Sequence, residues 1–190
     1  MSSAPWLVVG LGNPGSKYEH TRHNVGEATI RRWAQSAGVT LKRVKSWGEA
    51  AKIPGSPIVV AIPSGYMNTS GGPVAGLARY FKTPPEQVIV IHDDLDLVAH
   101  ALKLKRGGGH GGHNGLRDIQ KALGTPEFVR IRIGIGRPPG RMDPADYVLQ
   151  KIPASHREDW GVTESDAIDA VGLMITDGLE AAQQRYHSAN

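Results

Sequence analysis

The sequence has no cysteine among its 190 residues, which excludes disulfide bonds and thiolate chemistry. It also has no long hydrophobic run: no stretch approaches the roughly 20 apolar residues that a membrane-spanning helix needs. The first residues, MSSAPWLVVGLG, carry no positively charged side chain, and their apolar stretch is too short for a signal peptide. These absences are compatible with a cytoplasmic setting, and we expect no membrane partner.

Repeats and linkers are absent as well: no segment recurs, and none is rich enough in Pro, Gly or Ser to divide the chain. Charged residues make up 21% and hydrophobic residues 39% of the sequence. This balance is typical of a globular protein with a buried core, and a length of 190 residues fits one domain of ordinary size. We therefore predict a single domain over residues 1–190.

The sequence does contain a regular alternation of strand-like and helix-like segments. Asn24 and Glu27 have the spacing of a capping box at the start of the first predicted helix. Apolar or alternating runs predict strands over residues 6–11, 44–53, 58–63, 88–93, 102–105 and 128–136. Helical periodicity and end signals predict helices over residues 25–37, 72–82, 114–123 and 163–186.

The connections between these segments predict the fold class. Alternating strands and helices favour one α/β domain with a twisted sheet flanked by helices. The connections 54–57 and 94–101 are too short to hold a helix, whereas neighbouring parallel strands need a longer crossover. The sheet is therefore predicted to be mixed, parallel in one part and antiparallel in another.

The stretch GLGNPG, residues 10–15, has the Gly-x-Gly-x-x-Gly spacing of a dinucleotide-binding turn. Such a turn is followed directly by a helix and, about 20 residues later, by an acid that binds the ribose. Here the residues after Gly15 are polar without a helical period, and residues 31–35 contain no acid. We therefore interpret the stretch as a tight turn after a strand, and we predict no nicotinamide cofactor.

Polar residues adjoin the ends of several predicted strands. Asn13, Asn68 and Asp93 each follow or end a strand, and His23 precedes the first predicted helix. Ligands of open α/β sheets bind outside the carboxyl ends of the strands, so these four residues are candidates for one site. Each also has a structural explanation, because the asparagines can form a turn or cap a helix and the other two can be surface residues.

A glycine-rich stretch, GGGHGGHNGL over residues 107–116, precedes the third predicted helix. Glycines leave backbone N–H groups accessible, and Lys and Arg residues lie on both sides, which favours a bound anion such as phosphate. A flexible loop with Asn114 as helix cap is the alternative. His110 and His113 form an H-x-x-H pair, but the glycines disfavour the helical spacing of a metal site, so we predict no metal.

The net charge of +4 is distributed unevenly. Residues 16–45 hold seven Lys/Arg and two acids, and residues 101–141 hold nine Lys/Arg and two acids. Residues 154–190 hold two Arg and seven acids. The two basic segments are compatible with binding to a polyanion such as nucleic acid, and equally with a basic surface in solvent.

Six motifs occur in order along the chain: GLGNPGSKYEHTRHNVG, YMNTSGG, HDDLDL, GGGHGGHNGLRDI, RIRIGIGRP and DYVL. In order and spacing they resemble the bacterial peptidyl-tRNA hydrolase family, over about residues 6–186. The resemblance implies hydrolysis of the ester that joins a peptide to the 3′-terminal ribose of tRNA, by a cytoplasmic monomer that uses no cofactor. The implied partner is the acceptor end of peptidyl-tRNA, with its 3′ ribose and 5′ phosphate.

The resemblance also implies roles for single residues. His23 matches the family's general base, and Asp93 matches the carboxylate that holds the imidazole while it takes a proton from water. Asn13 matches the residue that distinguishes blocked from free aminoacyl ends, through a bond to the neutral N–H of the peptide. No serine or cysteine nucleophile is required.

The remaining matches are substrate-binding positions. Two are amides that hold the peptide or the 3′ end, two are aromatic groove positions suited to stacking on a base or sugar, and two are cations that clamp the 5′ phosphate. The amides are Asn68 and Asn114. The aromatic positions are Tyr18 and Tyr66, and the cations are Lys105 and Arg132.

Two departures from the family pattern are local. Residues 98–100 replace a common Pro-Gly turn, and Gly65 stands where a bulkier residue often precedes the aromatic residue of YMN. Two other hypotheses also remain open. One is a non-catalytic RNA-binding protein with the same fold, and the other is a metal hydrolase that uses His110, His113 and an acid.

Overall fold

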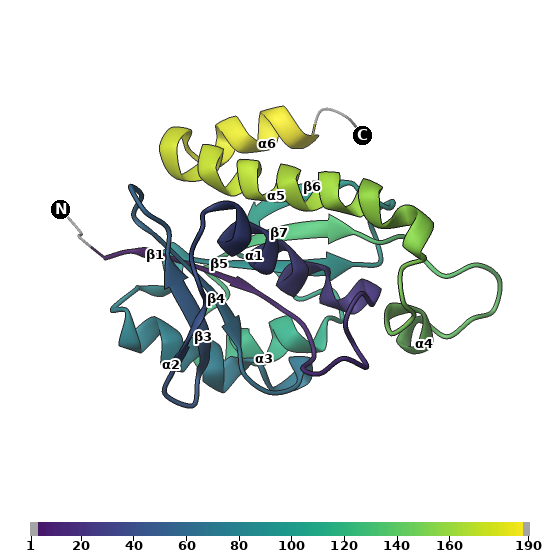
Figure 1. Cartoon of the computed structure of the whole chain (residues 1–190), viewed down its shortest axis with the longest axis horizontal. Helices are drawn as coiled ribbons and strands as arrows, with labels where there is room; N and C mark the ends of the chain where they lie inside the picture. Colours follow the sequence, from purple (N-terminus) through teal and green to yellow (C-terminus); the bar gives the residue numbers. More distant parts are fainter. Residues whose placement is uncertain (1–3, 188–190) are drawn as a thin grey trace.

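The computed structural model describes residues 4–187, which fold around a seven-stranded sheet (Figure 1). The parallel strands are β1 (Trp6–Gly10), β4 (Ile58–Pro63), β5 (Val88–Asp94) and β7 (Val129–Gly134). The antiparallel strands are β2 (Lys42–Val44), β3 (Gly48–Lys52) and β6 (Leu102–Arg106). The order β2-β3-β4-β1-β5-β7-β6 confirms the predicted mixed sheet, with its parallel part in the centre.

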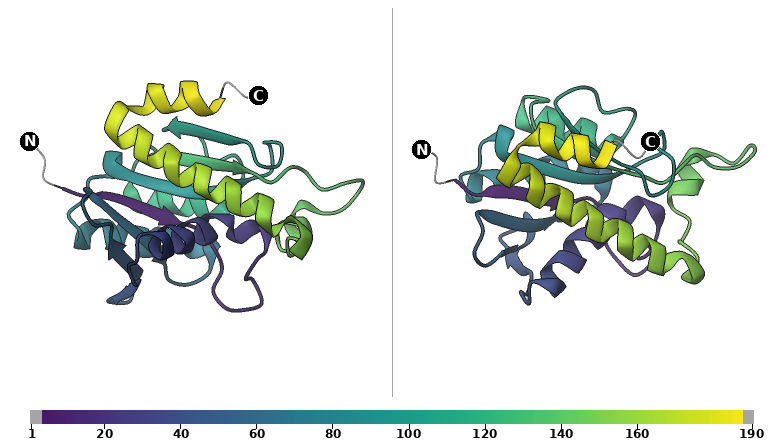
Figure 2. Two further views of the ribbon diagram at one scale, coloured as in Figure 1. Left: turned by 45° about the horizontal axis from the view of Figure 1, so that its top comes forward. Right: turned by 90° about the horizontal axis from the view of Figure 1, so that it is seen from above.

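Helices cover both faces of this sheet, as expected for an α/β domain (Figures 1 and 2). The helices on one face are α1 (Val25–Ser36) and α5 (Arg157–Asp177). The helices on the other face are α2 (Gly71–Tyr80) and α3 (Asn114–Leu123). The short helices are α4 (Pro144–Val148) and the single 3₁₀ turns Arg22–Asn24, Met67–Thr69, Pro85–Gln87 and Ala154–His156.

The last helix, α6 (Leu179–His187), lies along the outer edge of β6 (Figure 2). The backbone N–H of Leu104 donates to Nε2 of His187 at 2.8 Å, and the carbonyl of Leu104 accepts from the Gln183 amide at 3.0 Å. Exposed edge strands are open to pairing with other chains. Side chains of α6 therefore satisfy part of this edge.

Alternating side chains build two hydrophobic layers, one on each face of the sheet. In β1, Val8 faces the layer under α1 and α5, while Leu7 and Val9 face the layer under α2 and α3. All three side chains are fully buried. A strand buried on both faces has a continuous apolar sequence, which is why the run WLVV predicts a central parallel strand.

Close packing of α1 on the sheet depends on two glycines. A Cβ on Gly26 would lie 2.2 Å from the carbonyl oxygen of Ile91 in β5, and a Cβ on Gly10 would lie 2.2 Å from the carbonyl oxygen of Gly26. Helix and strands therefore meet backbone to backbone. This contact fixes the start of α1, and with it the preceding turn that carries His23, over the end of β5.

Three predicted segments differ from the structure. Residues 44–53 are not one strand, because a turn at Lys45 (φ 49°) folds β2 back onto β3. The tail is not one helix over 163–186: α5 begins earlier, and the chain bends at Gly178 (φ 101°) before α6. Helix α4 was missed, since it is only one turn long and follows a Pro-rich segment.

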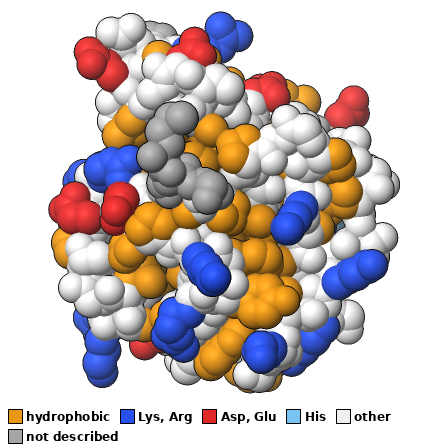
Figure 3. Space-filling view, turned by 90° about the vertical axis from the view of Figure 1, so that its left-hand side faces the viewer, with side chains coloured by type: hydrophobic (Ala, Val, Ile, Leu, Met, Phe, Trp, Pro, Cys, Tyr) orange, Lys and Arg blue, Asp and Glu red, His pale blue; other side chains and the backbone are white. Residues whose placement is uncertain are grey.

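The amino ends of the parallel strands lie at the end of the molecule that faces the viewer in Figure 3. Hydrophobic side chains there lie between separate Lys and Arg side chains. Within residues 4–187, no helix combines the length and the apolar character that crossing a bilayer requires.

Candidate active site

A cleft of about 620 Å³ lies among the segments that follow β1, β4 and β5. Its position agrees with the rule that open α/β sheets bind ligands outside the carboxyl ends of their strands. Lys105 and Arg132 are not part of its lining. The other seven predicted site residues line the cleft: Asn13, Tyr18, His23, Tyr66, Asn68, Asp93 and Asn114.

The Asp93 carboxylate lies at the centre of the polar cluster and binds two imidazoles. Nδ1 of His23 lies 2.7 Å from Oδ2, and Nε2 of His113 lies 2.9 Å from Oδ1. The Asp93 side chain is only 3% exposed, whereas the His23 side chain is 21% exposed. The carboxylate is therefore shielded from solvent, while the His23 ring reaches the cleft.

Hydrogen bonds determine which ring nitrogens carry protons. The backbone N–H of Leu116 donates to Nδ1 of His113 at 3.2 Å, so His113 carries its proton on Nε2 and donates it to Asp93. The carboxylate of Asp93 accepts from Nδ1 of His23 in the same way. Nε2 of His23 is then left unprotonated and has no hydrogen-bond partner within residues 4–187. This arrangement provides a base that faces the cleft.

The charges in this cluster are strongly coupled. Burial alone raises the pKa of Asp93, but His23 and His113 outweigh burial and hold this pKa well below its usual range. Burial lowers the pKa of His23, but the Asp93 carboxylate outweighs it and raises the pKa above its ordinary value. Asp93 is therefore ionised at neutral pH, and it stabilises the protonated form of His23.

A third imidazole, His92, lies behind this pair. It is 2% exposed, and its ring centroid lies 5.0 Å from that of His113. Nδ1 of His92 donates to the carbonyl oxygen of Asp93 at 2.7 Å. Burial and the neighbouring His113 lower the pKa of His92 to about 3, so this ring stays neutral. His92 thus fixes the end of β5 without adding a charge.

Asn13 is held in place by a second asparagine, Asn24. The backbone N–H of Asn13 donates to Oδ1 of Asn24 at 2.8 Å, and Nδ2 of Asn24 donates to the carbonyl of Asn13 at 2.9 Å. Asn24 is the N-cap residue of α1, as predicted, but its side chain makes no cap bond because it bonds the turn. Glu27 bonds Arg31 instead of completing a capping box.

The Asn13 side chain has a defined orientation. Its Oδ1 accepts from the backbone N–H of Met67 at 2.8 Å, so the assignment of oxygen and nitrogen in this amide is set by the donor. The N–H groups of Nδ2 are therefore the hydrogen-bonding groups that this amide can offer in the cleft that Asn13 lines. This amide therefore presents N–H donors, which suit an oxygen atom better than the peptide N–H that the family resemblance implied.

Two tyrosines and two amides extend the cleft. Tyr18 and Tyr66 meet edge to face with ring centroids 6.2 Å apart, and Tyr66 is 57% exposed. Asn68 and Asn114 are exposed and line the cleft. His113, not Asn114, is the N-cap of α3, and this leaves the Asn114 side chain unused by the helix.

The two predicted phosphate-clamping residues lie on the β6–β7 ladder. Lys103 is the direct cross-strand partner of Arg132, and Lys105 is the partner of Arg130, so all four side chains share one face of the sheet. Arg132 is oriented by a bond of 2.8 Å from its Nε to Asp94. Lys105 and Arg132 are thus diagonal neighbours outside the cleft.

The glycine-rich loop adjoins these cations. A Cβ on Gly108 would lie 2.6 Å from Nζ of Lys105, so the ammonium group lies against the loop. The guanidinium of Arg130 is buried and donates to the carbonyls of Gly107 and Gly108. Arg130 therefore anchors the loop, and Lys105 keeps its charge at the surface.

Both local departures from the family pattern have structural consequences. Gly65 has φ +80°, a left-handed conformation that favours glycine. His100 also has positive φ (74°), and its Nδ1 lies 2.7 Å from the Thr163 hydroxyl while its ring packs on Trp160. The segment that replaces a Pro-Gly turn is therefore attached to α5.

One group of side chains within residues 4–187 has metal-ligand character: His23, Asp93 and His113, whose ligand atoms lie within 4.8 Å of one another. Metal coordination through Nε2 of His113 requires a proton on Nδ1, but Nδ1 accepts from Leu116 N–H. The hydrogen bonds therefore oppose a metal here, and His110 does not belong to the group. The absence of a metal cofactor stays a prediction.

Comparison with known proteins identifies the family. Residues 7–190 match the family model described as peptidyl-tRNA hydrolase. The chain belongs to the peptidyl-tRNA hydrolase family. Curated peptidyl-tRNA hydrolases from Kineococcus radiotolerans and Nocardia farcinica are 49% and 53% identical, with 99% and 98% of both chains covered. Family membership makes the chain a hydrolase, and the prediction of an enzyme is confirmed.

The fold agrees with the same family. The crystal structure of peptidyl-tRNA hydrolase from Acinetobacter baumannii has 36% sequence identity and a TM-score of 0.86, over 98% of this chain and 95% of that chain. The single α/β domain with a mixed sheet is therefore the architecture of a peptidyl-tRNA hydrolase.

Sequence reasoning missed two residues of this peptidyl-tRNA hydrolase site. His113 was considered only as half of a metal pair, and Asn24 only as a helix cap. The signal for His113 was its place three residues before a buried leucine at the start of α3, where a cap is needed. Nothing local in the sequence pointed from Asn24 to Asn13.

Proposed function

We propose that this protein hydrolyses the ester bond between a peptide and the 3′-terminal ribose of tRNA, with His23 as general base and Asp93 as its partner. The observation that carries the proposal is the 2.7 Å contact between Nδ1 of His23 and Oδ2 of Asp93. It leaves Nε2 of a cleft-lining histidine as an acceptor for a water proton. Membership of the peptidyl-tRNA hydrolase family supports the substrate.

The reaction proceeds in two proton transfers. Nε2 of His23 takes a proton from water as the water oxygen attacks the ester carbonyl carbon. Collapse of the tetrahedral intermediate breaks the bond to the ribose 3′ oxygen, which takes the proton back from His23. Asp93 stabilises the imidazolium between these steps, and its second imidazole, His113, keeps the carboxylate in position. Such a base contributes about 10²–10⁴-fold to the rate.

The amides of the cleft serve the peptide and the carbonyl. Nδ2 of Asn13 offers donors to an oxygen atom, and we assign it to a substrate carbonyl or to the developing oxyanion. Asn68 and Asn114 hold the peptide or the 3′ end, and the Tyr18–Tyr66 pair stacks on a base or sugar at the mouth of the cleft.

The tRNA 5′ phosphate binds outside the cleft, at Lys105 and Arg132. Both residues project from the same face of the β6–β7 ladder, and Asp94 orients the Arg132 guanidinium. The carboxylate also reduces the net positive charge at this position. Affinity for tRNA is then shared with other cations of the basic segments, and it falls as salt rises. We expect a cytoplasmic monomer.

The test is cleavage of an N-acetylaminoacyl-tRNA by the wild-type chain and by His23→Ala. We expect the substitution to reduce turnover by about 10²–10⁴-fold and to leave tRNA affinity within a few-fold of wild type, because the base is not a phosphate contact. His156→Ala, an exposed histidine outside the cleft, is the matched control. Retention of most activity by His23→Ala would overturn the mechanism, and wild-type binding without turnover would leave an RNA-binding protein.

A further inference from the structure

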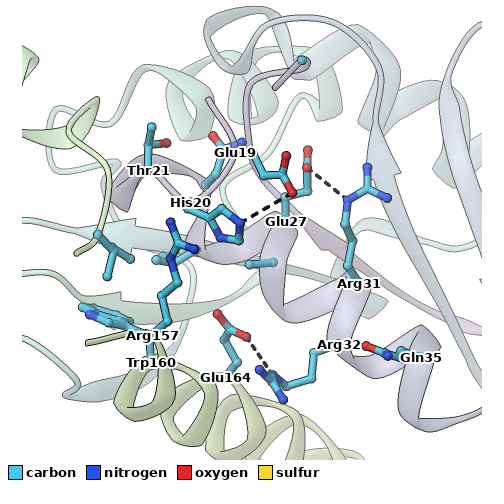
Figure 4. Close-up of a pocket in the computed structure, with 15 residues that line it drawn as sticks. Glu19, His20, Thr21, Glu27, Arg31, Arg32, Gln35, Arg157, Trp160 and Glu164 are labelled. Atoms are coloured by element: carbon cyan, nitrogen blue, oxygen red, sulfur yellow. Dashed lines mark hydrogen bonds and ion pairs between the residues drawn. The ribbon is translucent and has the colours of Figure 1, made fainter. Parts of the chain in front are cut away.

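A second pocket of about 620 Å³ lies on the other side of the segment that carries His23. Its walls are the loop before α1, the outer face of α1 and the first turns of α5 (Figure 4). Apolar side chains line part of it, among them Ile152 and Trp160. Cavities of this size with an apolar base and a few converging polar groups are typical binding sites for small molecules.

The charged groups in this pocket are not equally engaged. Glu27 pairs with Arg31 at 3.2 Å, and Glu164 pairs with Arg32 at 2.8 Å (Figure 4). The third acid, Glu19, lies 3.6 Å from His20. Each carboxylate of the pocket therefore already has a cationic or titratable neighbour.

The third guanidinium, that of Arg157, has no acidic partner within residues 4–187. Figure 4 shows its side chain extending along the pocket toward His20. A guanidinium group binds a carboxylate through two parallel N–H donors, and it gains most where part of its surroundings is apolar. Arg157 is therefore the cation of this pocket that is available to pair with an anionic ligand.

Two further observations indicate that the pocket is more than a surface hollow. His20 has φ +65°, a strained conformation for a residue with a Cβ, and it is held there by a bond of 2.8 Å from Ile152 N–H to its carbonyl. Burial raises the pKa of Glu27 although Arg31 opposes the change. Strained backbone and perturbed carboxyls both concentrate at binding sites.

We propose that this pocket binds a small organic monocarboxylate, whose charged group pairs with Arg157 and whose apolar part lies on Ile152 and Trp160. Three cations and three acids line the pocket, so a ligand with one negative charge matches the free guanidinium. A doubly charged phosphate monoester meets the three carboxylates with less compensation.

The position of the pocket allows such a ligand to influence the active site through Asn24. Asn24 lines the pocket and also holds the backbone of Asn13 through two hydrogen bonds. Thr21, at the end of the loop, lines it too. A ligand in the pocket therefore lies beside Thr21 and Asn24, and Asn24 holds the cleft residue Asn13. The site is thus suited to modulate turnover.

Binding is tested with 3-phenylpropionate as probe, followed by the indole N–H signal of Trp160 in ¹H–¹⁵N spectra, identified among the four tryptophans by Trp160→Phe. We expect saturable shifts with Kd on the order of 1 mM, weakened about tenfold or more in Arg157→Gln. Arg43→Gln, an exposed arginine outside both cavities, is the control and should bind as wild type. The neutral amide of the probe should not bind, and phenyl phosphate should bind more weakly.

Three results would overturn this proposal: no saturable shift at 10-fold the expected Kd, equal binding by Arg157→Gln, or preference for phenyl phosphate. Turnover is measured separately with saturating probe. A change of at least twofold in the wild type that is lost in Arg157→Gln supports the regulatory role, and unchanged turnover removes it. Since binding is read without hydrolysis, failure of this site and failure of the proposed reaction are distinguishable.

Discussion

The side chain of Asn24 holds the backbone of Asn13 through a matched pair of hydrogen bonds, 2.8 Å to its N–H and 2.9 Å to its carbonyl. Both residues are buried, at 4% and 9% exposure, so the pair is largely removed from water. The turn after β1 thus presents the Asn13 amide to the cleft in one orientation. The Asn24 side chain therefore acts on the active site although it does not line the cleft.

Asn24→Asp separates this positioning role from helix capping. Aspartate caps helices as well as asparagine does, so a capping residue would tolerate the change. We expect instead a loss of about 1–3 kcal/mol in unfolding free energy, because the carboxylate cannot donate to the Asn13 carbonyl, together with a fall in kcat/KM. Urea denaturation and the tRNA cleavage assay measure the two effects. Wild-type stability and activity would contradict the role of the pair.

Asp93→Asn is expected to change the pH dependence of turnover as well as its size. His23 acts as a base only when neutral, so wild-type activity falls as pH drops through its raised pKa. Without the carboxylate only burial remains, which lowers this pKa, and the acid limb moves to lower pH. We expect kcat to fall by about 10²–10⁴-fold. A pH–rate profile from pH 5 to 9 measures both effects. An unshifted acid limb would show that Asp93 does not raise the pKa of His23.

Asp93→Asn is also expected to lower the unfolding free energy by an amount that depends on pH. The lowered pKa of Asp93 contributes stability above its unfolded value of 3.8, and this contribution is lost as pH falls through the folded-state value. The raised pKa of His23 contributes below 6.5 and is lost as pH rises through its folded-state value. Asp93→Asn should therefore destabilise the fold most between these two limits, near pH 5. Equal destabilisation at pH 9 would argue against the coupling.

Lys105→Gln and Arg132→Gln test the phosphate contacts. Each change should weaken tRNA binding and reduce the slope of log K against log salt by about 1, because one counterion fewer is released. Lys52→Gln, an exposed residue at the end of β3 and outside both basic segments, is the matched control. Binding titrations at several salt concentrations give the slopes. Unchanged slopes for both variants would contradict a phosphate contact by Lys105 and Arg132.

Gly26→Ala tests the close contact of α1 with the sheet. The added Cβ would lie 2.2 Å from the Ile91 carbonyl oxygen, so helix and strand must separate. We expect a loss of about 3 kcal/mol or more in unfolding free energy, as for other overpacked backbone contacts. Gly172→Ala, in the open interior of α5 with nothing near its Cβ, should stabilise by about 0.5–1 kcal/mol. Thermal unfolding compares the pair, and equal effects would contradict the packing argument.

Much of the fold follows from local patterns. Continuous apolar runs predict β1, β4 and β5, since a strand buried on both faces has no polar side. The error at residues 44–53 also has a local cause: a hairpin of short strands around Lys45 has almost the same composition as one strand. One helix was predicted in place of α5 and α6 because a single glycine, Gly178, is a weak signal for the end of a helix.

Local patterns predict the class of fold and bring four cleft-lining residues, Asn13, His23, Asn68 and Asp93, to strand ends or a helix start, because side-chain periodicity and strand ends are local properties. The other three, Tyr18, Tyr66 and Asn114, follow from the resemblance of the motifs to the family. The bonds between these side chains depend on three-dimensional packing. His23 and Asp93 are 70 residues apart, and Asn13 takes its partners from Asn24 and Met67. Hydrogen bonds between distant segments depend on distances of tenths of an ångström, which close packing sets and residue type does not.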